Sequence, residues 1–160
     1  MLKSDVDMEE SVVSSSNYRI LTNLAKTTSG KVATIYNSRK NPLPFGGTKT
    51  EYNPEMDEYT KTVQFYYQGI GGASAKNVVE PLKNSEYLIV LPRKDKGGDG
   101  SYQVFGWQSP MTATAQVQDE ETGYWLITMT CSEPSAEISL FDTDIPTTKE
   151  IFDALVAAAF

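Results

Sequence analysis

Residues 58–68 read EYTKTVQFYYQ and carry the strongest strand signal in the chain. Alternate side chains of a strand point to opposite faces, and aromatic and β-branched residues favour strands. One face of this segment holds threonine, glutamine and tyrosine, so it is largely polar. The other face carries Tyr59, Lys61, Val63, Phe65 and Tyr67. The segment therefore predicts a strand with two unlike faces, which differs from the buried strand of a parallel sheet.

Two further segments predict a hairpin. Met111–Gln118 (MTATAQVQ) alternates without a break, and Tyr124–Cys131 (YWLITMTC) follows after the polar segment Asp119–Gly123. Glycine at position 123 suits a hairpin turn because it adopts positive φ angles readily. The second strand would present to the core Trp125, Ile127, Met129 and Cys131. Cys131 is therefore expected to be a buried small hydrophobe.

Shorter segments predict the remaining strands. Apolar runs or alternation indicate strands at Tyr18–Leu24, Lys31–Tyr36, Ser101–Trp107 and Ala136–Phe141. Glu86–Leu91 (EYLIVL) is apolar on both faces, which predicts a buried central strand.

Two helices are expected beside the strands. Residues 73–83 carry an apolar stripe of Val78, Val79 and Leu82, which predicts a short flanking helix. Residues 148–159 predict a C-terminal helix, with Thr147 and Glu150 forming a capping box. The fold class is therefore mainly β, an antiparallel β-sandwich or barrel with these two helices.

The domain organisation is one body with two appendages. Residues 1–16 are polar, acidic and rich in serine, and we expect an arm that is ordered only by packing on a surface, for which a neighbouring copy is one candidate. Residues 17–160 form a single β-sandwich domain. Residues 37–57 are broken by proline and glycine and predict a long protruding loop, whose alternative is a surface loop without a partner. The candidate inter-subunit contacts are Ser14, Ser15, Ser16, Phe45 and Tyr52.

Composition excludes several classes of catalyst. The chain has 160 residues, 14 Lys and Arg, 21 Asp and Glu, a net charge of −7, no histidine and one cysteine. It therefore holds no Ser-His-Asp or Cys-His pair, no intrachain disulfide and no zinc site built from cysteine and histidine. The segment MLKSDVDMEE at positions 1–10 lacks the apolar region of a signal peptide, and no apolar run reaches membrane-spanning length. We expect a protein without a membrane partner, made in a cytoplasm and kept there or assembled from there into something larger.

Acidic residues concentrate near the C-terminus. Residues 119–160 carry one base, Lys149, against nine acids, a net charge of −8. One interpretation is a solvated face that aids solubility, and the other is a surface past which DNA moves without binding. For the second interpretation, the candidate acidic residues facing a channel are Asp119, Glu120, Glu121, Glu133 and Glu137.

The remaining motifs are weak signals of chemistry. Gly69–Ser74 (GIGGAS) lacks the third glycine of a dinucleotide-binding turn and sits in no repeated βαβ pattern. Asp95, Asp99 and Ser101 lie among basic residues, which argues against a calcium loop. We therefore expect no catalytic residues, no metal and no cofactor, and we expect that the protein is not an enzyme.

A resemblance points to one class of protein. Tyr87–Val90 (YLIV), Tyr102–Trp107 (YQVFGW), Met111–Ala115 and Gly123–Pro134 (GYWLITMTCSEP) occur in an order that resembles tail proteins of bacteriophages infecting Bacteroidetes, most closely the tail tube family. The resemblance covers about residues 58–142 and rests on short hydrophobic phrases.

The resemblance implies a virion structural protein. Such proteins form closed rings, commonly hexameric, that stack into a tube with a continuous inner β-barrel and an acidic channel through which DNA passes without specific binding. The implied partners are copies of the chain within and between rings and other phage tail proteins, and the implied place is the tail of a virion assembled in the bacterial cytoplasm. Two alternatives stay open: a single-copy head–tail connector or tail terminator ring, and a monomeric β-sandwich module that binds a ligand through exposed aromatic residues such as Tyr66, Tyr67 or Trp107.

Overall fold

The strand predicted from residues 58–68 lies inside a four-stranded antiparallel sheet. The computed structural model describes residues 1–27, 47–67, 71–93, 98–118, 121 and 123–156. The sheet contains, in spatial order, β3 (Gly47–Asn53), β4 (Glu58–Tyr67), β8 (Trp125–Glu133) and β7 (Thr112–Gln118). All three pairings are antiparallel, and β7 and β8 form the predicted hairpin.

One face of this sheet builds a hydrophobic core. Val63 lies opposite Met129 and Phe65 opposite Ile127, and all four side chains are buried. Cys131 is buried on the same face, as its place in the alternation predicted. Leu82, Phe105 and Met111 complete this cluster. The polar–apolar alternation of β4 and β8 thus sets which face packs inward.

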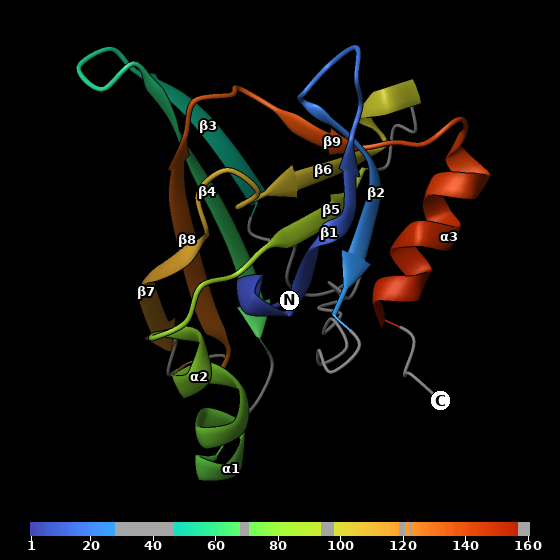
Figure 1. Cartoon of the computed structure of the whole chain (residues 1–160). Coiled ribbons are helices and arrows are strands. Elements are labelled where there is room, and N and C mark those ends of the chain that lie inside the picture. The colour runs from blue at the N-terminus through green and yellow to red at the C-terminus, as the bar shows by residue number, and fades with distance from the viewer. Residues whose placement is uncertain (28–46, 68–70, 94–97, 119–120, 122, 157–160) are drawn as a thin grey trace.

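A second sheet of five strands lies beside the first (Figure 1). Its spatial order is β1 (Val6–Val13), β2 (Ile20–Lys26), β9 (Ile138–Leu140), β6 (Tyr102–Phe105) and β5 (Ile89–Pro92). The pairing of β2 with β9 is parallel, which differs from the antiparallel expectation, while the other three pairings are antiparallel. The two sheets stay open and are not closed into a barrel.

The strand predicted as central, Glu86–Leu91, instead forms β5 at the edge of its sheet. It is apolar on both faces because it lies between the two hydrophobic clusters. Leu88 and Val90 contact the cluster of the five-stranded sheet, whereas Ile89 and Leu91 contact the cluster of the four-stranded sheet. The apolar pattern therefore predicted the apolar contacts on both sides, but Ile89, Val90 and Leu91 are half-buried and the strand lies at an edge.

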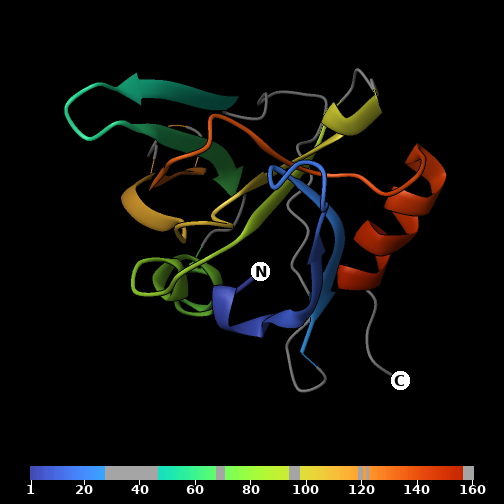
Figure 2. The same cartoon turned by 45° about the horizontal axis from the view of Figure 1, so that its top comes forward.

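Both expected helices are present. The first is a helical segment of three short pieces, α1 (Gly72–Ser74), a π-helical turn (Ala75–Val79) and α2 (Glu80–Leu82). The second, α3 (Ile145–Val156), packs on β2 at the far side of the five-stranded sheet (Figure 2). Its cap differs from the predicted box, because the Asp144 side chain accepts a hydrogen bond from the Thr147 amide at 2.8 Å. Hydrogen bonds from the Thr147 side chain and from its backbone amide hold the pKa of Asp144 below its usual value.

Two predicted irregular segments contain strands. Residues 6–13 of the expected arm form β1, which pairs with β2 of the same chain after a 3-10 turn at Lys3–Asp5. Residues 47–53 of the expected loop 37–57 form β3, and its first part lies outside the described residues together with the strand expected at Lys31–Tyr36. A second 3-10 turn spans Gly98–Gly100. Backbone pairing to a neighbouring strand overrides the polar composition of both segments.

Candidate functional site

Among the predicted acidic residues, Glu133 departs most from expectation. Its side chain is fully buried, and its Oε2 lies 2.6 Å from Nζ of Lys61, which is also fully buried. Its Oε1 accepts hydrogen bonds from the backbone amides of Gln108 at 3.0 Å and Ser109 at 3.4 Å. The expectation that Glu133 faces a channel is therefore wrong. The physical reason is that Glu133 lies two residues beyond Cys131 and so shares the core face of β8.

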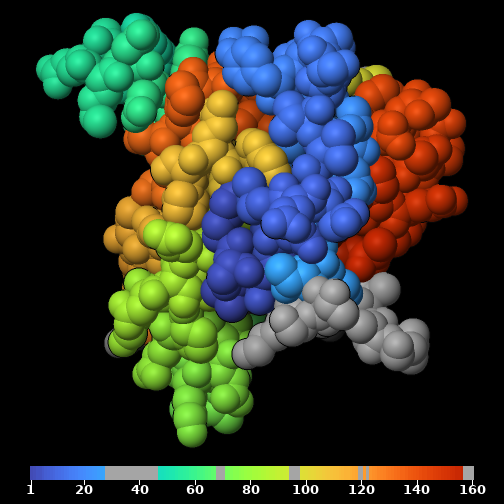
Figure 3. All heavy atoms as spheres, in the orientation of Figure 1, coloured from blue at the N-terminus to red at the C-terminus, as the bar shows by residue number. Residues whose placement is uncertain are grey.

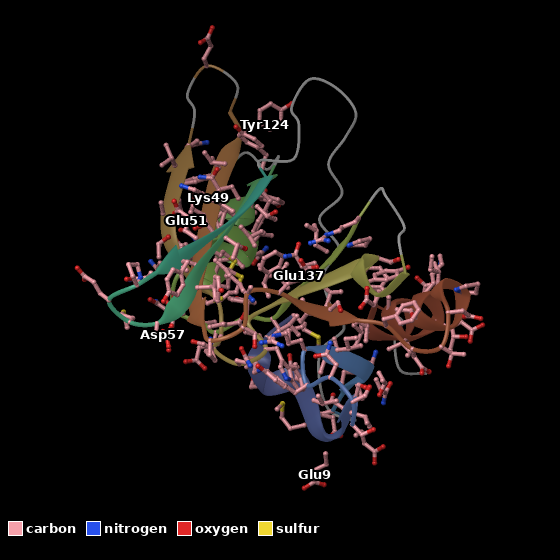
Figure 4. The ribbon with its side chains drawn as sticks, turned by 90° about the horizontal axis from the view of Figure 1, so that it is seen from above. Glu9, Lys49, Glu51, Asp57, Tyr124 and Glu137 are labelled. Atoms are coloured by element: carbon pink, nitrogen blue, oxygen red, sulfur yellow. The ribbon has the colours of Figure 1, made fainter. Side chains whose placement is uncertain are left out.

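The two other predicted acids that the structure describes, Glu121 and Glu137, lie at different elements. Glu121 is exposed between β7 and β8, and Asp119 and Glu120 lie outside the described residues. Glu137 lies before β9, where its Oε1 is 2.9 Å from a guanidinium nitrogen of Arg93. Figure 4 shows Glu137 well away from Lys49 and Glu51 on β3.

The predicted subunit contacts fall at two places. Tyr52 lies on β3 with 53% of its surface exposed, and its hydroxyl donates to Oδ1 of Asp57 at 2.9 Å. This hydrogen bond raises the pKa of Tyr52. The turn between β1 and β2 contains Ser14, Ser15 and Ser16, where the hydroxyls of Ser14 and Ser16 are 3.0 Å apart. Phe45 lies outside the described residues.

The face of the four-stranded sheet that points away from the core carries hydroxyl and amide groups along much of its length, and apolar side chains near the β7–β8 turn. We call it the outer face. Thr62, Thr130 and Thr112 form one row across β4, β8 and β7. In the next row, Nε2 of Gln64 donates to Oγ1 of Thr128 at 3.2 Å. The other members from these three strands are Thr60, Ser132, Ala115, Tyr66, Leu126 and Val117.

Charge is sparse on the outer face and lies near the β3–β4 turn. The register places Lys49 and Glu51 of β3 and Glu58 of β4 on this face. Nζ of Lys49 lies 2.7 Å from Oε1 of Glu51, and 65% and 58% of these side chains are exposed. The two point from the same face of one strand in Figure 4. Lys49 is thus the one cation on the outer face among the residues that the structure describes.

The four described sheet edges are unequal. β3 pairs with β4 through seven consecutive residues without a bulge, and its interior side chains are all exposed. By contrast, β7 has an irregularity between Ala113 and Ala115, β1 is irregular between Asp7 and Val12, and β5 has four residues and ends at Pro92. Bulges, prolines and short length are the features that hinder pairing with another strand. Among the described residues, the outward side of β3 is therefore the best-formed edge without a neighbouring strand, and the β3–β4 end of the sheet projects from the body of the molecule (Figure 3).

Comparisons of this chain with protein-family models, with curated proteins and with solved structures find no match.

In the described ranges, no three His, Cys, Asp or Glu side chains gather closely enough to hold a metal ion. Burial raises the pKa of the Cys131 thiol to about 12. No helix within the described part of the chain is long and apolar enough to cross a membrane.

The sequence carried an unused signal for the outer face. A Thr-x-Thr triplet occurs at residues 60–62, 112–114 and 128–130, and the structure places these three triplets in the neighbouring strands β4, β7 and β8. The triplet at 48–50 lies on β3, where Thr48 and Thr50 are on the inner side. Threonine at alternate positions favours a strand with a polar, exposed face. The triplets of β4, β8 and β7, more than the acidic C-terminal region, identify the candidate surface.

Proposed function

We propose that this chain is a structural protein that assembles with copies of itself into rings, as the unit of a phage tail tube through which DNA passes. The proposal combines the resemblance of residues 58–142 with the geometry of the four-stranded sheet. It assigns to the free edges the contacts between copies, and to the outer face the wall of the channel.

The observation that carries the proposal is the direction of the two free edges. Because the order β3-β4-β8-β7 is antiparallel at every step, β3 and β7 run in opposite directions. A copy rotated about an axis along the strands keeps its strand directions, so its β3 would meet β7 of the first copy in antiparallel orientation. Repetition of this head-to-tail contact closes a ring or continues as an open helix, and closure joins the sheets into one barrel.

The chemistry of the outer face agrees with a channel for DNA. Phosphate groups bind to arginine and lysine side chains, and this attraction dominates nonspecific binding of DNA. The described outer face has one lysine, Lys49, which is paired with Glu51. In the described residues, a wall of hydroxyl, amide and apolar side chains whose one cation is paired gives a moving polyanion little to bind.

Two alternatives differ in what they require. A head–tail connector or terminator ring would use the same edges but would be present as one ring in each particle. A monomeric ligand-binding module would need an aromatic platform, and on the outer face Tyr66 is 37% exposed, whereas Tyr67 and Trp107 are half-buried. These exposures favour the ring proposal over the module.

The decisive experiment changes the free edge without changing the core. Thr48 is exposed on β3 and lies on the inner side of the sheet opposite the uncharged Val63, so Thr48→Lys would bury a charge only when a neighbouring copy pairs there. A matched control is Ala154→Lys, at an exposed position of α3 on the far side of the molecule.

Electron microscopy and sedimentation should show rings or tubes for the unchanged protein and for Ala154→Lys, and monomers with unchanged circular dichroism for Thr48→Lys. A strictly monomeric unchanged protein at high concentration would overturn the proposal, as would rings of Thr48→Lys that equal those of the unchanged protein.

A further inference from the structure

We infer that Glu51 is a specificity-determining residue that keeps the outer face from binding nucleic acid, because it neutralises Lys49. This inference rests on the proposed function and deepens it. It concerns one side chain and one class of partner, a double-stranded polyanion.

The geometry isolates these two side chains from other charges. Lys49 and Glu51 are two residues apart on β3, so they share a face and meet at 2.7 Å. Their cross-strand neighbours on β4 are Thr62 and Thr60, which carry no charge. Among described residues, the third charged group of the outer face is Glu58, opposite Asn53. Removal of Glu51 would therefore leave Lys49 without a carboxylate beside it on its own strand.

The pair contributes little to folding. Both side chains are more than half exposed, and exposed ion pairs contribute about 0–1 kcal/mol because water and salt screen them. Its effect lies in the charge of the outer face. With the pair intact, one cation stands against two anions. With lysine in place of Glu51, two cations stand against one anion, and the sign of the face is reversed.

Assembly multiplies this change. Each copy in a ring contributes the same β3, so the cations of Glu51→Lys would recur around the wall. A duplex inside the ring meets several of them at once. Each neutralised phosphate releases condensed counterions, so binding of DNA would be strong at low salt and would weaken steeply as salt rises.

The experiment compares rings of four proteins for retention of a short fluorescent duplex DNA on a filter, at about 50 mM and about 200 mM salt. The proteins are the unchanged chain, Glu51→Lys, the charge-swapped Lys49→Glu/Glu51→Lys, and Glu150→Lys. Glu150 is exposed on α3, so its replacement changes the net charge equally but away from the outer face. Glu51→Gln, which removes only the carboxylate charge, is a fifth protein with a smaller expected rise.

We expect Glu51→Lys to retain at least tenfold more DNA than the unchanged protein at the lower salt and to lose this excess at the higher salt. The charge-swapped protein and Glu150→Lys should behave like the unchanged protein. If Glu51→Lys does not form rings, the rise for Glu51→Gln decides the question.

Three outcomes would overturn the inference: no excess retention by Glu51→Lys or Glu51→Gln, equal retention by the charge-swapped protein, or equal retention by Glu150→Lys. Each of these leaves the proposed function standing when electron microscopy shows rings. Absence of rings from the unchanged protein rejects the proposed function itself and this inference with it.

Discussion

Two lysine–glutamate pairs lie on adjacent strands of the same sheet and differ mainly in their access to water. Lys61 and Glu133 meet at 2.6 Å with both side chains fully buried. Lys49 and Glu51 meet at 2.7 Å, and both side chains are more than half exposed. The nearly equal distances would suggest equal strength. Burial makes the two pairs unequal in their effect on stability. A buried charge that loses its partner has nothing to replace it, whereas water solvates an exposed charge that loses its partner.

The buried pair also holds a loop. The carboxylate of Glu133 accepts from the amides of Gln108 and Ser109 while it contacts Lys61, so one side chain joins β4, β8 and the segment before β7. The exposed pair joins two positions of a single strand. The first pair therefore belongs to the stability of the sheet, and the second to the chemistry of its surface.

The largest expected effect comes from breaking the buried pair. Glu133→Gln leaves the Lys61 ammonium buried without a counter-charge, and we expect unfolding to become easier by about 3–5 kcal/mol. The double variant Lys61→Met/Glu133→Gln removes both charges but keeps an oxygen acceptor for the loop amides. We therefore expect its free energy of unfolding to return most of the way to that of the unchanged protein. Urea denaturation measures both values.

The control for this change is Glu137→Gln, which breaks the partly exposed pair with Arg93 and should cost less than about 1 kcal/mol. If Glu133→Gln lowered the free energy of unfolding no more than Glu137→Gln does, burial would not explain a difference in stability between the two pairs.

A smaller effect is expected at Gly106, which precedes the loop that Glu133 holds. Its φ is +87°, and an added Cβ would lie 2.5 Å from the Tyr87 carbonyl oxygen and 3.1 Å from Cγ of Met111. Gly106→Ala should therefore lower the free energy of unfolding by about 1–3 kcal/mol, the range for a strained backbone position. Gly72→Ala is the matched control, since its Cβ would meet nothing within 4 Å. Equal unfolding midpoints for the two variants would contradict the role of the close contact.

The smallest effect is expected from the exposed pair. Lys49→Met should change the free energy of unfolding by less than about 1 kcal/mol. This difference should shrink further in high salt, because added ions screen the attraction between the two charges. Urea denaturation at two salt concentrations tests this. A salt-independent loss comparable with that of Glu133→Gln would mean that Lys49 is part of the fold rather than of the surface.

The sequence predicted the strands that bury one face and leave the other polar. The alternation of β4 placed Lys61 on the same face as Val63 and Phe65, and that of β8 placed Met129 and Cys131 on the core face. The same alternation extended by one step would have buried Glu133 opposite Tyr59. The alternation therefore contained enough information to predict the buried pair. The pattern did not suggest it because lysine and glutamate are rarely fully buried.

Other features depend on partners that are distant in sequence. β3 has no aliphatic residue and β1 carries three acids among eight residues, so their strand form follows from pairing with β4 and β2. The edge position of β5 depends on which strand neighbours β6, and apolar pattern alone does not specify neighbours. The residues of the outer face can be identified only when the register of all four strands is known.

The parallel contact between β2 and β9 sets a condition on how the molecule is made. Residues 20–21 align with residues 139–140, so the middle of the five-stranded sheet joins an early segment to a late one. During translation, β1 and β2 can form their hairpin soon after they leave the ribosome, but β9 emerges more than a hundred residues later. The nascent hairpin lacks its β9 neighbour until then, and we expect the closure of so long a loop to be a slow step of folding.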